Sequence, residues 1–246
     1  MANQFNDQNS ERAFYDSFWR TQLALSCDEK CRMRFILSEI KRVWSDTVQG
    51  ARGHLRIADV GCGRGWLTQL LSQFGETVGF DRSTTEARKR HPAGRFVECN
   101  ILELPPDDFD LAVCSEVIEH VRTEEQPKLM DSLFSILRPG GILIMTTPNK
   151  PQVSRLIGQL SLQHELQPVE NWLDARELEQ VVGSCFEIEN IATVMFFPVA
   201  VRKIGLLSRI YRAVYEQMNA YRLVDPLFQR TKGGLYIGMV AKRKRG

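Results

Sequence analysis

From about residue 55 onward, short apolar runs alternate with longer segments whose apolar residues recur three or four positions apart, as in 66–74 and 129–137. The short runs are almost continuously apolar, which is typical of strands that are buried on both faces. Strands that alternate with helices predict a parallel sheet wound by right-handed crossovers. The predicted strands are 55–60 (LRIADV), 77–81 (TVGFD), 95–99 (RFVEC), 109–114 (FDLAVC) and 141–147 (GILIMTT).

The pattern changes after residue 147. Residues 150–172 have the pattern of a helical insertion that ends near Pro168. Asp174 then occupies the position of a helix N-cap and Gly183 that of a helix stop, so we predict a helix between them. The remaining predicted strands are 186–197 and 234–242.

These elements predict one α/β domain rather than several. We expect it to span 51–246, with a helical extension at 1–50 and insertions at about 150–172 and 198–233. The chain has 246 residues, of which 43% are apolar and 25% charged, and these values are ordinary for a globular protein with a sizeable core.

The sequence contains no predicted membrane span or leader. The longest apolar run, 191–201, is shorter than the roughly 20 residues that a transmembrane helix needs. The first residues are polar and acidic, unlike a signal peptide. Six cysteines without a disulfide-type spacing fit reduced thiols, so we expect a cytoplasmic protein.

The net charge of +2 conceals an asymmetry along the chain. Residues 202–246 contain 11 Lys or Arg and only two acidic residues, whereas the preceding residues carry a net negative charge. A basic segment of this kind could contact phosphate, an acidic ligand or an anionic membrane surface, the last through 198–233. An ordinary solvated helix face explains the same charges equally well.

A glycine-rich turn follows the first predicted strand. The sequence ADVGCGRG places Gly61, Gly63 and Gly65 where a strand enters a helix, and glycine there permits positive φ and close approach of a ligand. A dinucleotide fingerprint has the spacing G-x-G-x-x-G, but the third glycine position holds Trp66. The turn therefore argues against a nicotinamide cofactor.

Two further strand ends carry polar side chains. Asp81 ends the second predicted strand, twenty residues after Gly61, and Asn100 follows the third. A carboxylate at such a position can accept hydrogen bonds from both hydroxyls of a ribose. Three successive strands would thus direct binding groups into one crevice, where open α/β sheets bind their ligands.

In these residues the sequence resembles the class I S-adenosylmethionine-dependent methyltransferases, including the ubiquinone-biosynthesis O-methyltransferase-like and the type 11 and 23 families. The similarity covers about 55–148 and continues weakly to the end. Beside ADVGCGRG and Asp81, the blocks PPDDFDLAVCSEVIEHV and LRPGGILIMTTPN are similar to the fourth-strand and fifth-strand regions of the class. The resemblance implies a Rossmann-like, doubly wound, mostly parallel seven-stranded sheet with an antiparallel last strand, and an enzyme that uses S-adenosylmethionine.

The resemblance also implies a role for each matching residue. Asp59 would lie near the amino acid part of the cofactor, and the two glycines of the turn would line its backbone side. Asp81 would hold the ribose diol, and Asn100, where the class more often has Asp, would accept a hydrogen bond from the adenine amino group. The cofactor-binding residues expected on this basis are Asp59, Gly61, Gly63, Asp81, Asn100, Ile101 and Ser115.

The string EVIEH, residues 116–120, is the candidate for catalysis. If it is helical, Glu116, Glu119 and His120 share one face and offer a general base or part of a divalent-metal site. The string is similar to those of ubiquinone-biosynthesis O-methyltransferases and of small-RNA terminal 2′-O-methyltransferases. That resemblance implies a divalent cation such as Mg²⁺ held by Glu116, Glu119, His120 and a later histidine, here His164. His120, assisted by Glu119, could instead act as the base, or the residues could be structural.

The acceptor remains open at this point. The favoured hypothesis is O-methylation of a small molecule such as a phenol, a quinone precursor or a sugar. One alternative is RNA 2′-O-methylation. Two others are a nicotinamide-dependent oxidoreductase and a binding module without catalytic activity. The aromatic pairs Phe14/Phe18 and Tyr15/Trp19 could form a lid over the acceptor, although packing onto the domain is favoured.

Overall fold

The structure is a computed structural model that describes residues 8–21, 24–47, 54–160, 169–196, 209–211, 214–215, 220, 224, 227 and 233–244. Most of the predicted insertion at 198–233 and most of the basic segment at 202–246 therefore lie outside the described residues, and their proposed contacts stay predictions. The division of the chain at residue 50 also stays a prediction.

A single seven-stranded sheet has the order β3-β2-β1-β4-β5-β7-β6. Neighbouring strands among the first five pair in parallel, and β7 pairs antiparallel with both β5 and β6. The predicted mostly parallel sheet with an antiparallel last strand is thus confirmed. The strands are β1 (Leu55–Val60), β2 (Gly75–Asp81), β3 (Arg95–Glu98), β4 (Phe109–Ser115), β5 (Leu137–Pro148), β6 (Phe186–Phe196) and β7 (Gly234–Arg243).

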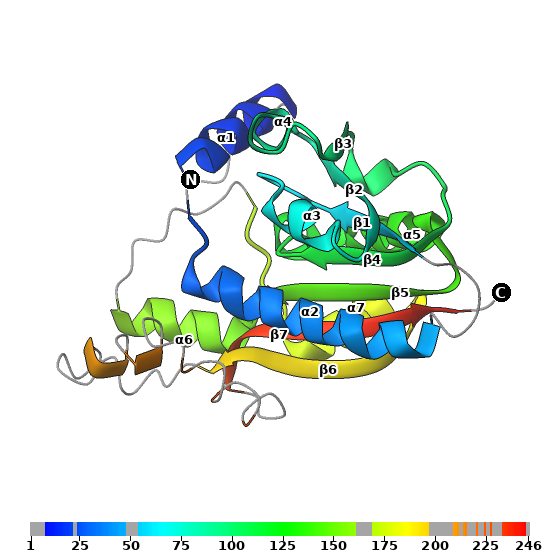
Figure 1. The fold of residues 1–246 in the computed structure, drawn as a ribbon. Coiled ribbons are helices and arrows are strands. Elements are labelled where there is room, and N and C mark those ends of the chain that lie inside the picture. The colour runs from blue at the N-terminus through cyan, green and yellow to red at the C-terminus, as the bar shows by residue number, and fades with distance from the viewer. Residues whose placement is uncertain are drawn as a thin grey trace.

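Helices cover both faces of the sheet (Figure 1). Two of them, α1 and α2, precede the first strand, and α1 packs beside α4. The predicted insertion at 150–172 begins as the helix α6, while 161–168 are outside the described residues and 169–172 are not helical. The helices are α1 (Gln8–Thr21), α2 (Cys27–Thr47), α3 (Trp66–Leu71), α4 (Thr85–Arg90), α5 (Gln126–Ile136), α6 (Lys150–Leu160) and α7 (Ala175–Gly183).

Alternate residues of the central strands are buried in two separate clusters, one on each side of the sheet. Ile57 and Ile144 pack with α2 and α3 in one cluster, and Ala58 and Leu143 pack with α5 and α7 in the other. Each strand therefore needs apolar side chains on both faces, which explains the nearly continuous apolar runs in the sequence.

The helix predicted after Asp174 is present with its cap. Asp174 Oδ1 accepts hydrogen bonds from the backbone N–H groups of Arg176 (2.8 Å) and Glu177 (2.9 Å). Glu177 returns the interaction by accepting from the Asp174 N–H at 2.8 Å. This reciprocal capping box satisfies N–H groups that lack partners within the helix, and it fixes where α7 begins.

Among the described residues, no helix combines the length and the apolar character that crossing a bilayer requires. The expected cytoplasmic location stays a prediction.

Candidate functional site

A cavity of about 820 Å³ lies at the carboxyl ends of the parallel strands. Its wall includes Asp59 near the end of β1, Asp81 at the end of β2, Ser115 at the end of β4 and Pro148 at the end of β5. Because open α/β sheets bind ligands at this edge, the cavity is the candidate site.

The glycine turn after β1 forms the floor of the cavity. Gly61, Gly63 and Gly65 have φ values of 78°, 51° and 81°, a conformation that disfavours side chains. A Cβ atom on Gly61 would overlap the side chain of Val117, and one on Gly63 would lie 2.7 Å from Trp19 Cζ2. The turn therefore requires glycine on both conformational and steric grounds.

Asp81 is fixed beside this turn by two backbone amides. The Gly63 N–H donates to Asp81 Oδ2 at 2.8 Å, and the Ser83 N–H donates to Oδ1 at 3.1 Å. Burial nevertheless raises the pKa of this carboxyl. The side chain lines the cavity as a preoriented acceptor, in the place expected for a group that binds a diol.

Asp59 also lines the cavity and is only 1% exposed. Its Oδ2 accepts a hydrogen bond from the Thr68 hydroxyl at 2.6 Å. Burial, with the nearby charge of Asp81, raises the pKa of Asp59 to about 7. A positively charged ligand group beside Asp59 would stabilise the ionised form of its carboxyl group.

The end of β3 differs from the expectation in one respect. Ile101 lines the cavity, but Asn100, which is also among the described residues, is not part of the wall. The Asn100 Oδ1 accepts from the Leu102 N–H at 3.2 Å and caps the 3₁₀ turn Ile101–Glu103. The adenine contact expected of Asn100 thus stays a prediction.

The EVIEH string does not form the α-helix on which its shared face depended. Glu116 has φ 57°, a value uncommon for a residue with a side chain, and a 3₁₀ turn covers only Ile118–His120. The Glu116 N–H donates to the Thr146 carbonyl at 2.9 Å, which keeps this residue beside β5. Glu116 therefore does not share a helix face with Glu119 and His120.

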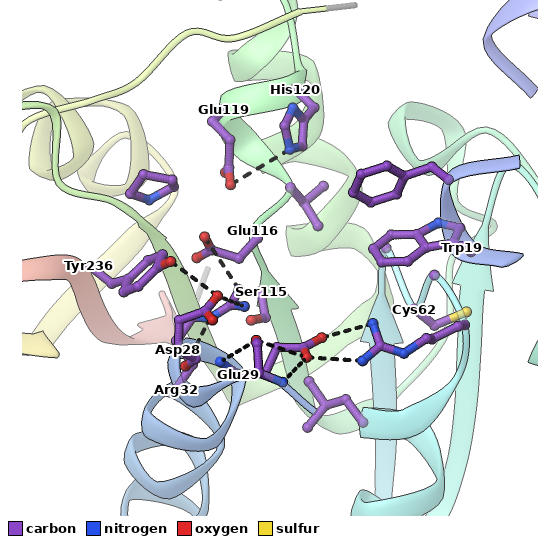
Figure 2. A pocket seen from close by; sticks show the side chains of 18 of the residues that line it. Trp19, Asp28, Glu29, Arg32, Cys62, Ser115, Glu116, Glu119, His120 and Tyr236 are labelled. Atoms are coloured by element: carbon purple, nitrogen blue, oxygen red, sulfur yellow. Dashed lines mark hydrogen bonds and ion pairs between the residues drawn. The ribbon is translucent and has the colours of Figure 1, made fainter. Parts of the chain in front are cut away.

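The Glu116 carboxylate contacts Arg32 of α2, a residue that the sequence analysis did not identify. Glu116 Oε2 lies 3.3 Å from Arg32 Nη1, and Oε1 accepts from the Thr146 hydroxyl at 3.1 Å. Arg32 is further paired with Asp28, and its guanidinium lies over the ring of Tyr236 (Figure 2). Burial raises the pKa of Glu116 to about 8, while Arg32 opposes that shift.

Glu119 and His120 lie together on another part of the wall. Glu119 Oε2 accepts from the Thr147 hydroxyl at 3.0 Å, and Oε1 lies 3.9 Å from His120 Nε2 (Figure 2). The Nδ1 of His120 lies 2.9 Å from the carbonyl oxygen of Val169. Burial raises the pKa of Glu119 to about 8.

The expected metal ligands are not assembled into a ligand set. Within the described parts of the chain, no three His, Cys, Asp or Glu side chains are placed to hold one ion. The carboxylate of Glu116 faces Arg32 and that of Glu119 faces Thr147, whereas His164 is outside the described residues. The predicted divalent-cation site is therefore without support.

The aromatic residues of α1 reach the cavity. Tyr15, Phe18 and Trp19 all belong to its wall, so they contribute to the site as well as packing on the domain. Other apolar residues also line the cavity: Val153, Leu156, Ile157, Trp172 and Leu235.

Sequence and structure comparisons agree on one family. Residues 29–194 match a family model described as a methyltransferase domain. A ubiquinone biosynthesis O-methyltransferase of Rickettsia bellii is 29% identical over 144 residues, which cover 55% of this chain and 57% of that protein. A mitochondrial protein of the same name from Rattus norvegicus is 33% identical over 118 residues, or 42% of this chain and 34% of that one. The matches thus span about half or less of these relatives.

Solved structures share the fold at low identity. The N-methyltransferase NodS from Bradyrhizobium japonicum, in complex with S-adenosyl-L-homocysteine, has a TM-score of 0.61 and 12% identity, with 95% of this chain and 98% of that chain covered. An S-adenosylmethionine-dependent methyltransferase from Archaeoglobus fulgidus has a TM-score of 0.56 and 16% identity, with 88% and 97% covered. The family model covers more than half of the chain, so the chain belongs to the methyltransferase domain family, and it has the fold of class I S-adenosylmethionine-dependent methyltransferases.

Proposed function

We propose that this enzyme methylates a hydroxyl group of a small molecule, such as a phenol, a quinone precursor or a sugar. The observation that carries the proposal is the contact between His120 Nδ1 and the carbonyl oxygen of Val169. A carbonyl oxygen can only accept a hydrogen bond, so in the neutral imidazole Nδ1 holds the proton and Nε2 keeps a lone pair. An imidazole in this state, at the wall of the cavity, can deprotonate a hydroxyl.

The glycine-turn end of the cavity suits S-adenosylmethionine. Gly61 and Gly63 expose the backbone of the turn at the cavity wall, and Asp81 provides a fixed acceptor for a ribose. The carboxylate of Asp59 suits the ammonium group of the cofactor, because a cation favours its ionised form. The residues proposed to hold the cofactor are Asp59, Gly61, Gly63, Asp81, Asn100, Ile101 and Ser115.

In this proposal the protein positions the cofactor and the acceptor, and it removes the proton of the acceptor hydroxyl. When bound, S-adenosylmethionine supplies the methyl group, which moves from sulfur to the acceptor oxygen. Holding the reacting atoms in line is worth about 7–11 kcal/mol of the barrier. His120 Nε2 takes the hydroxyl proton, and the nearby Glu119 carboxyl group, when ionised, stabilises the resulting imidazolium.

The walls of the cavity favour a small acceptor over RNA. The apolar part of the cavity wall suits a flat or apolar molecule. Among the described wall residues, guanidinium groups are fewer than carboxyl groups, and Arg32 and Arg64 are already paired with acidic side chains, so the wall lacks the excess positive charge that a phosphate backbone needs. The carboxylates are Asp28, Glu29, Asp59, Asp81, Glu116, Glu119 and Glu170, and the guanidiniums are Arg32, Arg64 and Arg82.

The relatives support the same reaction class. Ubiquinone biosynthesis O-methyltransferases methylate oxygen by their names, and the two relatives match 55% and 42% of this chain. The glycine spacing, with Trp66 at the third position of a dinucleotide fingerprint, speaks against a nicotinamide-dependent reaction.

The direct test is methyl transfer from labelled S-adenosylmethionine to a panel of catechols, hydroxyquinones, sugars and short RNAs. We expect label in a hydroxylated small molecule, in a product whose fragmentation places the methyl group on oxygen. Transfer to RNA alone, or to nitrogen alone, would overturn the proposal.

A further inference from the structure

Residues of the N-terminal helices α1 and α2 line the same cavity as the glycine turn that follows β1. The side chain of Asp16 accepts a hydrogen bond from the Ser83 hydroxyl, and Arg90 donates to the Trp19 carbonyl at 2.7 Å. These contacts fix α1 beside α4, so that its aromatic residues face the glycine turn. Figure 2 shows Trp19 across the pocket from Tyr236.

The indole of Trp19 packs directly on the cofactor-binding turn. A Cβ atom on Gly63 would lie 2.7 Å from Cζ2 of the indole, so the missing side chain is what admits the ring. The same Gly63 donates its N–H to Asp81, the residue placed at the ribose. The ring therefore stands beside the nucleoside end of the site.

Arg64, the next residue of the turn, holds this arrangement together. Its guanidinium carbon lies 5.8 Å from the centre of the Trp19 ring, within cation–π range. Its Nη1 and Nη2 each lie 2.9 Å from an oxygen of the Glu29 carboxylate, in a bidentate pair. Glu29 also accepts from the N–H and the hydroxyl of Ser26 at 2.9 and 3.0 Å.

This ion pair is deeply buried, since the side chains of Arg64 and Glu29 are 3% and 8% exposed. A buried pair contributes little net stability, because desolvation of the two charges offsets their attraction. It does impose a fixed geometry, since the planar guanidinium binds the carboxylate in one orientation. Its position between the turn and α2 points to a positioning role.

We propose that the Trp19 indole is a wall of the S-adenosylmethionine site that packs against the bound nucleoside, and that the Arg64–Glu29 pair positions it. The inference rests on S-adenosylmethionine as the cofactor and not on the hydroxyl acceptor. Failure of the acceptor assay and failure of the tests below are therefore separate results.

The first test measures cofactor binding by calorimetry and by intrinsic fluorescence, with S-adenosylhomocysteine as the probe. We expect Trp19→Ala to raise its Kd at least about tenfold, with Trp19→Phe intermediate because an aromatic face remains. Binding should change the fluorescence of the unaltered protein more than that of Trp19→Phe. An unchanged Kd in Trp19→Ala, or an equal fluorescence change in Trp19→Phe, would overturn the role of the indole.

The second test separates positioning from stability. Arg64→Gln or Glu29→Gln alone leaves a buried charge unpaired and should lower Tm. The double variant Glu29→Gln/Arg64→Gln removes both charges, so its Tm should recover while Kd stays raised about tenfold because no guanidinium holds the indole. Recovery of both quantities would show a purely structural pair. The matched control is Arg56→Gln, which should leave Kd unchanged. It breaks the ion pair of Arg56 with Asp107 at the start of β1, at the end of the strand away from the glycine turn.

Discussion

The Glu116 carboxylate lies 3.3 Å from the Arg32 guanidinium, and the Thr146 hydroxyl donates to its other oxygen. Both oxygens of Glu116 are therefore occupied by groups that a cation would have to displace. A buried guanidinium at this position also repels a second positive charge. The relationship bears directly on whether the reaction depends on a divalent ion.

We predict that turnover is unchanged by excess EDTA, because binding a cation would require Glu116 to leave Arg32. The measurement is methyl transfer by the purified enzyme before and after incubation with chelator, with a metal-dependent methyltransferase treated in parallel. Loss of activity that added Mg²⁺ restores would contradict the prediction.

Replacing His120 should remove the base and spare the cofactor. His120→Ala should lower kcat about 10²- to 10⁴-fold, the usual contribution of a positioned general base, with little change in cofactor Kd. Glu119→Gln should lower kcat less, because the imidazole remains and only a neighbouring carboxyl group that can ionise is lost. His91→Ala is the control, since His91 follows α4 and is not in the cavity wall. Wild-type turnover in His120→Ala would refute the assignment.

Asp81 is predicted to be a main determinant of cofactor affinity. Asp81→Ala should weaken binding by at least about 2 kcal/mol, or roughly 30-fold, because buried ribose hydroxyls lose a charged acceptor. Isothermal titration with S-adenosylhomocysteine measures this loss. Glu76→Ala, near the other end of β2 with a half-exposed side chain, should bind normally. Equal affinities of the two variants would exclude the ribose role.

Gly61 should tolerate no side chain. Gly61→Ala places a Cβ atom into Val117 at a φ of 78°, and we expect it to lower the free energy of unfolding by more than about 1 kcal/mol and to impair cofactor binding. Adding Val117→Ala should restore part of the stability, since it removes the steric overlap. Gly183→Ala is the control, because a Cβ there meets only Ile188 at 3.9 Å. Chemical denaturation gives the comparison.

The raised pKa of Asp59 predicts that cofactor affinity depends on pH. Because that pKa is about 7 in the free enzyme and the cofactor ammonium favours the ionised form, binding should release a proton below pH 7. The Kd should then rise as pH falls, by up to about tenfold per unit, and level off above pH 7. Titrations in buffers of different ionisation enthalpy count the protons released. In Asp59→Asn the cofactor Kd should depend less steeply on pH. An unchanged dependence would show that the released proton comes from another group.

Local sequence signals were sufficient for much of the fold. The apolar runs identified all seven strands, because the central strands are buried by helices on both sides and the edge strands keep alternate buried positions, and the cap at Asp174 identified the start of α7. Two strands begin earlier than predicted: β2 by two residues, at Gly75, and β5 by four, at Leu137, because Leu137 already pairs with Phe109 across a register shift.

The contacts of Glu116 in the site were not predictable from local sequence patterns. Nothing in the string EVIEH indicates that Glu116 adopts a positive φ, since this depends on its contacts with β5 and α2. The spacing of Asp28 and Arg32 is ordinary for a helix surface, and only the packing of α2 on the sheet brings them to Glu116 and Tyr236. Tertiary contacts between distant segments therefore decide the chemistry here.

The antiparallel strand β7 lies between β5 and β6 although it comes last among the described elements, and it brings Leu235 and Tyr236 into the cavity. Trp19, from the first helix, lines the same cavity. During translation, a chain emerges from the ribosome N-terminal end first. The enzyme consequently cannot complete the wall of its binding site during translation before Leu235 and Tyr236 have emerged, and a nascent chain halted upstream of β7 would hold β6 without its partner strand.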